Sequence, residues 1–276
     1  MRERVNTRIV GRVGPAEIAW REALAGWEIP GNILAQAPQP PWGFPPGRFA
    51  PPPEPVESVA RRYALAALPE GGTVVDVGCG AGAASLALVA KVGAVIGVDE
   101  RESMLDEFVR HARERDIDSR AVLGRWPDVA PSIEPVDVVV CHHVLYNVAD
   151  IEPFVRALSE HARHRVVVEV TDRHPMAFLR PLWRRFWNLE RPDGPSVFNL
   201  LAVLSEMRIR FMMNVEEREP DTWGTPDAEI ALIRRRLCLP ATRDAEIAEA
   251  LAEHPRRPPR IFAIAWPAPT RDRRPR

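Results

Sequence analysis

The stretch VVDVGCGAGAASLAL, residues 74–88, joins a short apolar run to three glycines that alternate with other residues. The apolar residues around Asp76 are typical of a buried strand, and the small residues after Gly82 are typical of a helix. A glycine-rich turn between a strand and a helix lets a ligand come close to the backbone at the helix N-terminus. This turn is therefore the first candidate ligand site of the chain.

Apolar strands and helices alternate on both sides of this turn as far as residue 170. Strands are expected over 73–77, 95–98, 121–123, 136–141 and 165–170, and helices over 55–68, 81–91, 103–115 and 151–161. Near-continuous apolar strands that alternate with helices indicate a parallel sheet covered on both faces. The pattern predicts an α/β fold with a doubly wound, mostly parallel sheet.

The flanking segments are less regular. Residues 38–55 are dense in proline, which stiffens the chain and cannot donate to a strand ladder. After residue 171, helices are expected over 197–206, 227–237 and 244–253, and strands over 209–215 and 260–266. We predict four parts: a proline-rich arm (1–55), a ligand-binding core (56–170), the rest of the sheet with cap insertions (171–267) and a disordered tail (268–276).

The overall composition is that of an ordinary soluble protein. The 276 residues carry a formal net charge of −1, so no global field favours nucleic acid or an anionic membrane as a partner. Cys79, Cys141 and Cys238 are scattered and form no C-x-x-C metal pair. The N-terminus has no apolar core of signal-peptide type, and no stretch approaches the roughly 20 apolar residues that span a bilayer. A cytoplasmic location is expected.

Two cofactors compete for the glycine turn. Gly78, Gly80 and Ala83 match the dinucleotide fingerprint, and Asp99 lies about 20 residues further on. However, a dinucleotide would place its pyrophosphate over the turn, where the carboxylate of Asp76 opposes it. S-adenosylmethionine (SAM) has no phosphate and carries an ammonium and a sulfonium, which a nearby carboxylate attracts. Asp76 therefore favours SAM.

Three motifs then resemble a known family. DVGCGAG, residues 76–82, is similar to the first motif of class I SAM-dependent methyltransferases. VIGVDERESML, residues 95–105, resembles the second-strand motif of that family, and residues 136–158 resemble its fourth strand and following helix. The resemblance implies a class I methyltransferase-like sheet of seven strands with an N-terminal arm and helical cap elements. It makes 56–170 the SAM-binding, Rossmann-like core and S-adenosylhomocysteine (SAH) the product.

The resemblance also implies roles for individual residues. The glycines let the backbone pass close to the cofactor, Asp76 orients its methionine end, and Asp99 accepts hydrogen bonds from both ribose hydroxyls. An ionised acid is an acceptor only, so one carboxylate can take both hydroxyls. The candidate cofactor-binding residues are Asp76, Gly78, Cys79, Gly80, Gly82, Asp99, Glu100, Met104, Arg125, Trp126 and His142.

The sequence departs from the family after the third strand. The family often has an acid there, near the adenine amine, whereas GRWPD places Arg125 at that position. Three alternatives stay open: adenine meets the backbone around Arg125, the ring of Trp126 packs on it, or Asp128 substitutes for the missing acid.

Residues that could carry chemistry follow the fourth and fifth strands. The catalytic candidates are His142, His143 and Tyr146, because an unperturbed histidine titrates near pH ~6.5 and can act as a general base. No metal site is expected, since adjacent side chains of an extended segment point to opposite sides. Glu169 contacts substrate or pairs with an arginine. A dedicated base is optional, because alignment and water exclusion can supply much of the rate.

The aromatic and basic stretch 178–187 has three interpretations: a cap helix with one buried face, a substrate pocket wall, or a nucleic-acid strip. We favour the first. The sequence thus predicts methyl transfer from SAM to an O, N or C nucleophile of a small or medium-sized molecule, mainly by positioning. The alternatives are an RNA or protein methyltransferase, a fold that binds SAM without catalysis, and a nicotinamide-dependent oxidoreductase.

Overall fold

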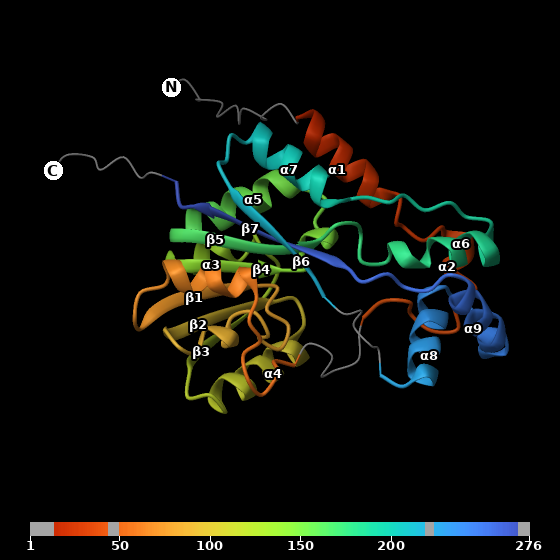
Figure 1. Cartoon of the computed structure of the whole chain (residues 1–276), viewed down its shortest axis with the longest axis horizontal. Coiled ribbons are helices and arrows are strands. Elements are labelled where there is room, and N and C mark those ends of the chain that lie inside the picture. Colours follow the sequence, from red (N-terminus) through yellow and green to blue (C-terminus); the bar gives the residue numbers. More distant parts are fainter. Residues whose placement is uncertain (1–13, 44–49, 219–223, 270–276) are drawn as a thin grey trace, which may run out of the picture.

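The computed structural model describes residues 14–43, 50–218 and 224–269, which form one sheet with helices on both of its faces (Figure 1). Parts of the predicted arm and tail, residues 1–13, 44–49 and 270–276, lie outside the described residues. The strands are β1 (Gly72–Val77), β2 (Val92–Asp99), β3 (Asp118–Leu123), β4 (Val136–His142), β5 (Ala162–Thr171), β6 (Met212–Glu217) and β7 (Arg260–Pro267).

The seven strands lie in the order β3-β2-β1-β4-β5-β7-β6. Neighbouring strands from β3 to β5 are parallel, whereas β7 runs antiparallel to both β5 and β6. The prediction of a doubly wound, mostly parallel seven-stranded sheet is confirmed. The strand order reverses between β1 and β4, and ligands of such sheets bind at this switch point, beyond the carboxyl ends of the strands.

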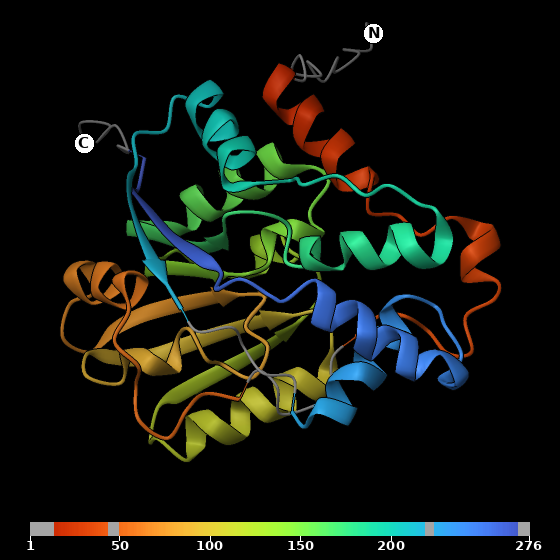
Figure 2. The same cartoon turned by 45° about the vertical axis from the view of Figure 1, so that its right-hand side comes forward.

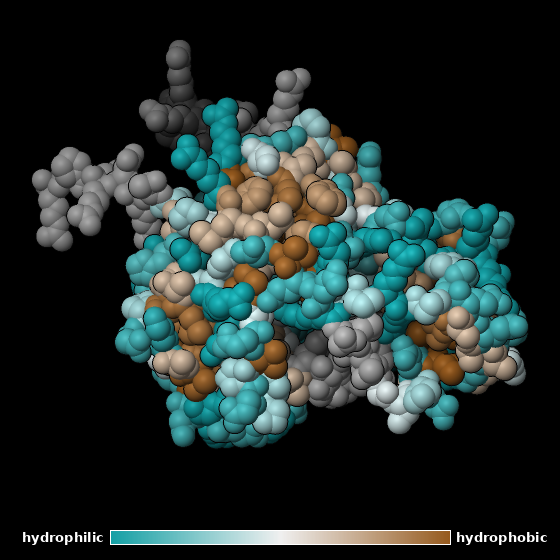
Figure 3. All heavy atoms as spheres, viewed as in Figure 1, coloured by the Kyte–Doolittle hydropathy of each residue, from teal (hydrophilic) through white to brown (hydrophobic). Residues whose placement is uncertain are grey.

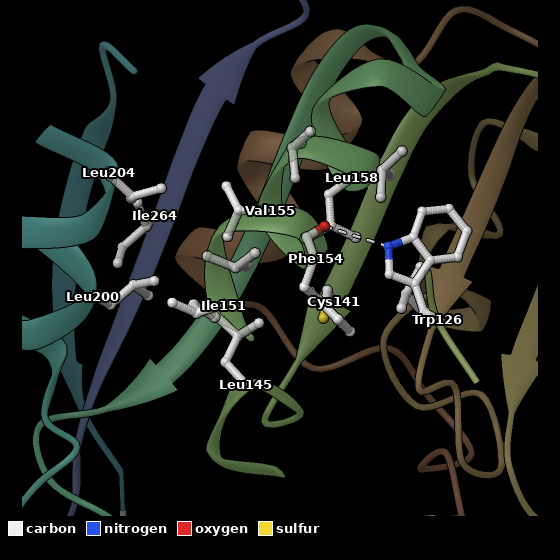
Figure 4. Close-up of a cluster of buried hydrophobic side chains, with 14 of the residues drawn as sticks. Trp126, Cys141, Leu145, Ile151, Phe154, Val155, Leu158, Leu200, Leu204 and Ile264 are labelled. Atoms are coloured by element: carbon white, nitrogen blue, oxygen red, sulfur yellow. Dashed lines mark hydrogen bonds between the residues drawn. The ribbon is translucent and has the colours of Figure 1, made fainter. Parts of the chain in front are cut away.

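The central strands of the sheet contain buried apolar residues that face both ways, because helices cover both faces of the sheet. On β1, Val75 and Val77 belong to one hydrophobic cluster and Val74 to the other. The first cluster packs under α1 (Pro15–Ala25), α5 (Ile151–His161) and α7 (Val197–Glu206), and the second under α3 (Val59–Ala67) and α4 (Glu102–Arg113). Figure 4 shows part of the first cluster, in which the indole of Trp126 donates to the carbonyl of Phe154 at 3.4 Å.

A third cluster holds the cap beside the sheet. It joins α2 (Gly31–Leu34), α6 (Arg180–Trp187), α8 (Pro226–Arg236) and α9 (Asp244–Glu253). Figure 2 shows these helices grouped at one end of the strands. Leu182 and Trp183 are buried in this cluster, so the cap-helix interpretation of residues 178–187 agrees with the packing.

One predicted element is wrong. Residues 81–91 form turns and a single 3-10 turn over Leu86–Leu88 instead of an α-helix. Ser85 donates both its backbone N–H and its hydroxyl to the buried carboxylate of Asp76, at 3.3 and 2.6 Å. The backbone N–H of Ser85 is thereby bonded to a side chain. Such side-chain bonds compete with the backbone hydrogen bonds of a helix.

The edge strand β6 and the helix α7 expose apolar side chains. Met212, Met213 and Val215 on the edge strand β6 are exposed, as is Phe198 on α7. In Figure 3 hydrophobic residues gather over α7 and the adjoining part of β6. None of the described helices is both long and apolar enough to cross a bilayer.

Candidate functional site

A cavity of about 2590 Å³ opens beyond the carboxyl ends of β1, β2, β4 and β5. One wall carries the residues that follow these strands, among them Gly78, Asp99 and His142. The opposite wall belongs to the cap and includes Trp27 and Trp183. A large cleft at the switch point of an α/β sheet is where a ligand is expected.

The glycine turn that follows β1 requires glycine at its first position. Gly78 has φ +72°, and a Cβ built there would lie 2.3 Å from Cγ2 of Val144. The N–H groups of Gly78 and Cys79 both donate to the carbonyl of Val98, at 2.8 and 3.0 Å. These bonds hold the turn against the end of β2, so its backbone forms part of the cavity wall.

Asp76 is a buried carboxylate at the base of this turn, with 1% of its surface exposed. Burial raises the pKa of Asp76 to about 6, and the hydrogen bonds from Ser85 oppose that rise. At neutral pH most of the molecules therefore hold an ionised Asp76 at the cavity wall. A cationic ligand would be favoured there, because it compensates a charge that burial has stripped of water.

Asp99 ends β2 and fixes the neighbouring turn. Its Oδ2 accepts from the N–H of Gly80 at 3.0 Å, and its Oδ1 accepts from the N–H of Arg101 at 3.0 Å. A carboxylate offers about four lone-pair positions, so each oxygen can accept a further hydrogen bond. Asp99 thus keeps acceptor capacity at the cavity wall for a ligand that donates two hydrogen bonds.

His143, Glu169 and Arg218 form a charged cluster at the ends of β4 and β5. Arg218 holds the buried carboxylate of Glu169 through two bonds of 2.7 Å, and Nε2 of His143 lies 3.0 Å from Oε1 of Glu169. Despite the cost of burial, the hydrogen bonds from His143 and Arg218 keep the pKa of Glu169 below its usual value. Glu169 is therefore ionised and can only accept, so Nε2 of His143 carries the proton and Nδ1 is the basic nitrogen.

The other ring groups at this edge are neutral. Burial lowers the pKa of His142 to about 4, and its Nε2 has no hydrogen-bond partner among the described residues. Burial raises the pKa of Tyr146 well above its usual value, and its hydroxyl lies 2.7 Å from Oγ1 of Thr171. Of these residues His143 has the unusual backbone, with φ +59°.

Comparisons with known proteins agree with this geometry. A family model described as a methyltransferase domain matches residues 74–165. A SAM-dependent methyltransferase of Geobacter sulfurreducens, solved with SAH, is 15% identical with a TM-score of 0.51, over 77% of this chain and 92% of its own. One of Thiobacillus denitrificans, also with SAH, is 17% identical with a TM-score of 0.50, over 88% and 100%. Residues 74–165 thus match a methyltransferase domain, and the fold of the chain is that of class I SAM-dependent methyltransferases.

A curated relative matches the chain over a short span. The ribosomal protein L11 methyltransferase of Thermotoga petrophila is 35% identical over 83 residues, which is 29% of this chain. The matched segment spans about 30% of the relative's own length.

Most residues predicted from the sequence line the cavity of this domain. They are Asp76, Gly78, Cys79, Gly80, Asp99, Glu100, Arg125, His142, His143 and Tyr146. Gly82 and Met104 do not line it: a Cβ on Gly82 would meet Leu86 at 2.7 Å, and Met104 is buried in the helix α4. Among the described residues no group of three or more His, Cys, Asp or Glu side chains is placed to hold a metal.

The three residues considered for the adenine contact lie in different environments. Trp126 is 4% exposed and packs edge-on against His161 within the hydrophobic core, so its indole presents no face to the cavity. Asp128 does not line the cavity either, whereas Arg125 does and lies 3.6 Å from Glu100. Of the three residues, only Arg125 lies in the lining of the cavity.

Several residues of the cavity wall could not be predicted from the sequence. Arg218 follows a weak edge strand, 49 residues beyond its partner Glu169, and nothing in its neighbourhood marks it. His174 and Trp27 stack with ring centroids 4.2 Å apart although they are far apart in the sequence. The one available hint was that a buried acid such as Glu169 needs a basic partner. The sequence contains too many arginines for this hint to identify Arg218.

Proposed function

We propose that the chain binds SAM in this cavity and transfers its methyl group to an O, N or C nucleophile of a small or medium-sized molecule. The observation that carries the proposal is that Asp76 and Asp99 both line the cavity beside the glycine turn of a methyltransferase domain. Asp76 would face the cationic methionine end, and Asp99 would accept from the ribose hydroxyls. The SAH bound to two proteins of similar fold supports this choice of cofactor.

In the proposed reaction the nucleophile attacks the methyl carbon of SAM. The carbon–sulfur bond breaks, its electron pair stays on sulfur, and neutral SAH leaves. The residues of this chain would align the two reactants and exclude water, which can supply much of the rate. His143 would accept the proton of the nucleophile at Nδ1, while Glu169 fixes the ring and stabilises the imidazolium.

The cap supports an acceptor of modest size. Residues of the N-terminal arm, including Pro41 and Trp42, and of α6 wall the cavity on the side away from the strands. We propose that arm and cap act as a substrate-binding part and residues 56–170 as the SAM-binding core. A protein acceptor is the second candidate, because the curated relative is named for a ribosomal protein. Labelled SAM offered with small molecules or with ribosomal proteins separates the two.

The cofactor assignment is tested by isothermal titration calorimetry with SAH and with NAD. We expect saturable binding of SAH at one site and no binding of NAD, since Asp76 would oppose a pyrophosphate over the turn. Tight binding of NAD together with no response to SAH would sink the proposal.

The role of His143 gives a separate prediction. Replacing His143 by glutamine removes the basic Nδ1 and should lower kcat roughly tenfold, below the usual effect of a general base because positioning supplies most of the rate. The measurement uses labelled SAM and an acceptor selected by screening, and the affinity for SAH should stay within about twofold. His164→Gln is the matched control, since that ring is half exposed outside the cavity. Unchanged kcat in His143→Gln would refute the role.

A further inference from the structure

The chain is almost neutral, but its cavity is not. Of the described residues that line the cavity, fourteen are arginine and eight are aspartate or glutamate. Five of these arginines lie between residues 173 and 191, where Glu190 is the one acid in the lining. The lining as a whole therefore holds more arginines than acids, although the formal charge of the whole chain is −1. Such a wall attracts anions.

Arg191 differs from the other four arginines of this segment. Each of the others, Arg173, Arg180, Arg184 and Arg185, has a carboxylate oxygen at most 3.6 Å away. Arg191 has no acidic partner among the described residues, although it is 3% exposed. Burial lowers the pKa of its guanidinium below the usual value, yet a guanidinium stays protonated at neutral pH. A buried positive charge without a counter-ion is costly.

The guanidinium is held so that one edge is left unused. Its Nη1 donates to the carbonyls of Gly26 and Glu28, at 3.0 and 2.7 Å, and its Cζ lies 4.3 Å from the ring centre of Trp183. Its Nε and Nη2 are buried and have no hydrogen-bond partner. These two nitrogens form the side of the guanidinium that matches the two oxygens of a carboxylate.

Aromatic rings connect this arginine to the end of β4. The ring of Trp27 lies 5.8 Å from Cζ of Arg191 and stacks on His174, and His174 in turn packs edge-on against Tyr146 at 5.8 Å. All four residues line the same cavity. Burial and the neighbouring Arg191 lower the pKa of His174 to about 3, so its ring adds no positive charge at neutral pH.

We propose that Arg191 binds a carboxylate group of the methyl acceptor, so that this domain methylates an organic acid. The assignment rests on the proposed function, because it names the substrate class of the same cavity. Binding of the anion would supply the missing counter-charge and satisfy the two unpaired N–H groups. Arg191 is then a specificity residue at the cap end of the cavity, and the reacting atom of the acid lies toward His143.

The test uses a carboxylate and its neutral counterpart. The intrinsic fluorescence of the chain, to which Trp27 and Trp183 beside Arg191 contribute, is titrated at constant ionic strength and saturating SAH with benzoate, benzamide and phenyl phosphate. We expect saturable binding of benzoate, weaker binding of benzamide, and a Kd for benzoate at least about tenfold higher in Arg191→Met than in the wild type. The Kd of Arg191→Lys for benzoate should lie between those of the wild type and Arg191→Met, because lysine keeps the charge but lacks the two parallel N–H groups.

Arg184→Met is the matched control, since that side chain is 72% exposed and paired with Glu190. It should bind benzoate within about twofold of the wild type. The proposal is overturned if the wild type does not prefer benzoate to benzamide. It is also overturned if Arg191→Met binds benzoate as tightly as the wild type. Tighter binding of phenyl phosphate than of benzoate would overturn the carboxylate assignment. Binding of SAH, measured by calorimetry in each variant, shows separately whether the proposed function holds.

Discussion

Replacing Asp99 by alanine is expected to raise the Kd for SAH by more than about 100-fold. The proposed role of Asp99 is to accept two hydrogen bonds from the ribose, and a hydrogen bond to a charged group contributes about 1.5–3 kcal/mol. In the wild type, the N–H of Gly80 donates to Oδ2 of Asp99 at 3.0 Å. The substitution removes this hydrogen bond, so the glycine turn is held less firmly. Both losses act in the same direction.

Two further variants separate the ribose contact from the support of the turn. Asp99→Asn keeps an oxygen for Gly80 but loses the charge and one acceptor, so we expect a loss of about tenfold. Asp106→Ala removes an exposed acid from α4, outside the cavity, and should leave the Kd unchanged within about twofold. Calorimetry measures all three. If Asp99→Ala binds SAH as tightly as the wild type, the ribose assignment is wrong.

Replacing Glu169 by glutamine is expected to lower the free energy of unfolding by about 3 kcal/mol at pH 7. Breaking a buried ion pair costs about 3–5 kcal/mol because it leaves a charge without its partner. The lower end applies here, since the side chain of Arg218 is 38% exposed and water screens the charge that remains. Urea denaturation of both proteins gives the difference.

The dependence of this difference on pH follows from the lowered pKa of Glu169. Its contribution to stability is fully present above the pKa of an unfolded glutamate and is lost as pH falls through the lower folded value. The gap between wild type and Glu169→Gln should therefore narrow in acid. Glu249→Gln removes one acid from an exposed cluster around Arg185 and should cost less than about 1 kcal/mol. A cost for Glu169→Gln no larger than that of the control would contradict the buried ion-pair account.

The fold could be predicted from the sequence because its strands are apolar on both faces. β1, β4 and β5 each contain two or three consecutive valines, at residues 74–75, 138–140 and 166–168, and such runs occur where helices cover both faces of a sheet. The same rule placed Asp99, His143 and Glu169 at one edge, since the carboxyl ends of parallel strands share an edge. The site was thus predictable to the extent that it follows from topology.

The remaining errors have local causes. The helix expected at 81–91 was overridden by a tertiary hydrogen bond, since Asp76 takes the N–H of Ser85. Trp126 was assigned to the cofactor because aromatic rings suit adenine, but its large apolar surface is equally suited to the core, where it lies. That Arg191 has no acidic partner could not be read from the sequence, because it depends on the packing of two distant segments, around residues 26–28 and 191.

The position of β7 also sets the order in which the site can be completed. β6 pairs with β7 and not with β5, so it has no place in the sheet until residues 260–267 have been synthesised. Arg218 directly follows β6 and reaches Glu169 on β5 across the inserted strand. A chain still on the ribosome can therefore form the glycine turn and the first five strands, but Glu169 remains without its arginine until the last strand of the sheet is added.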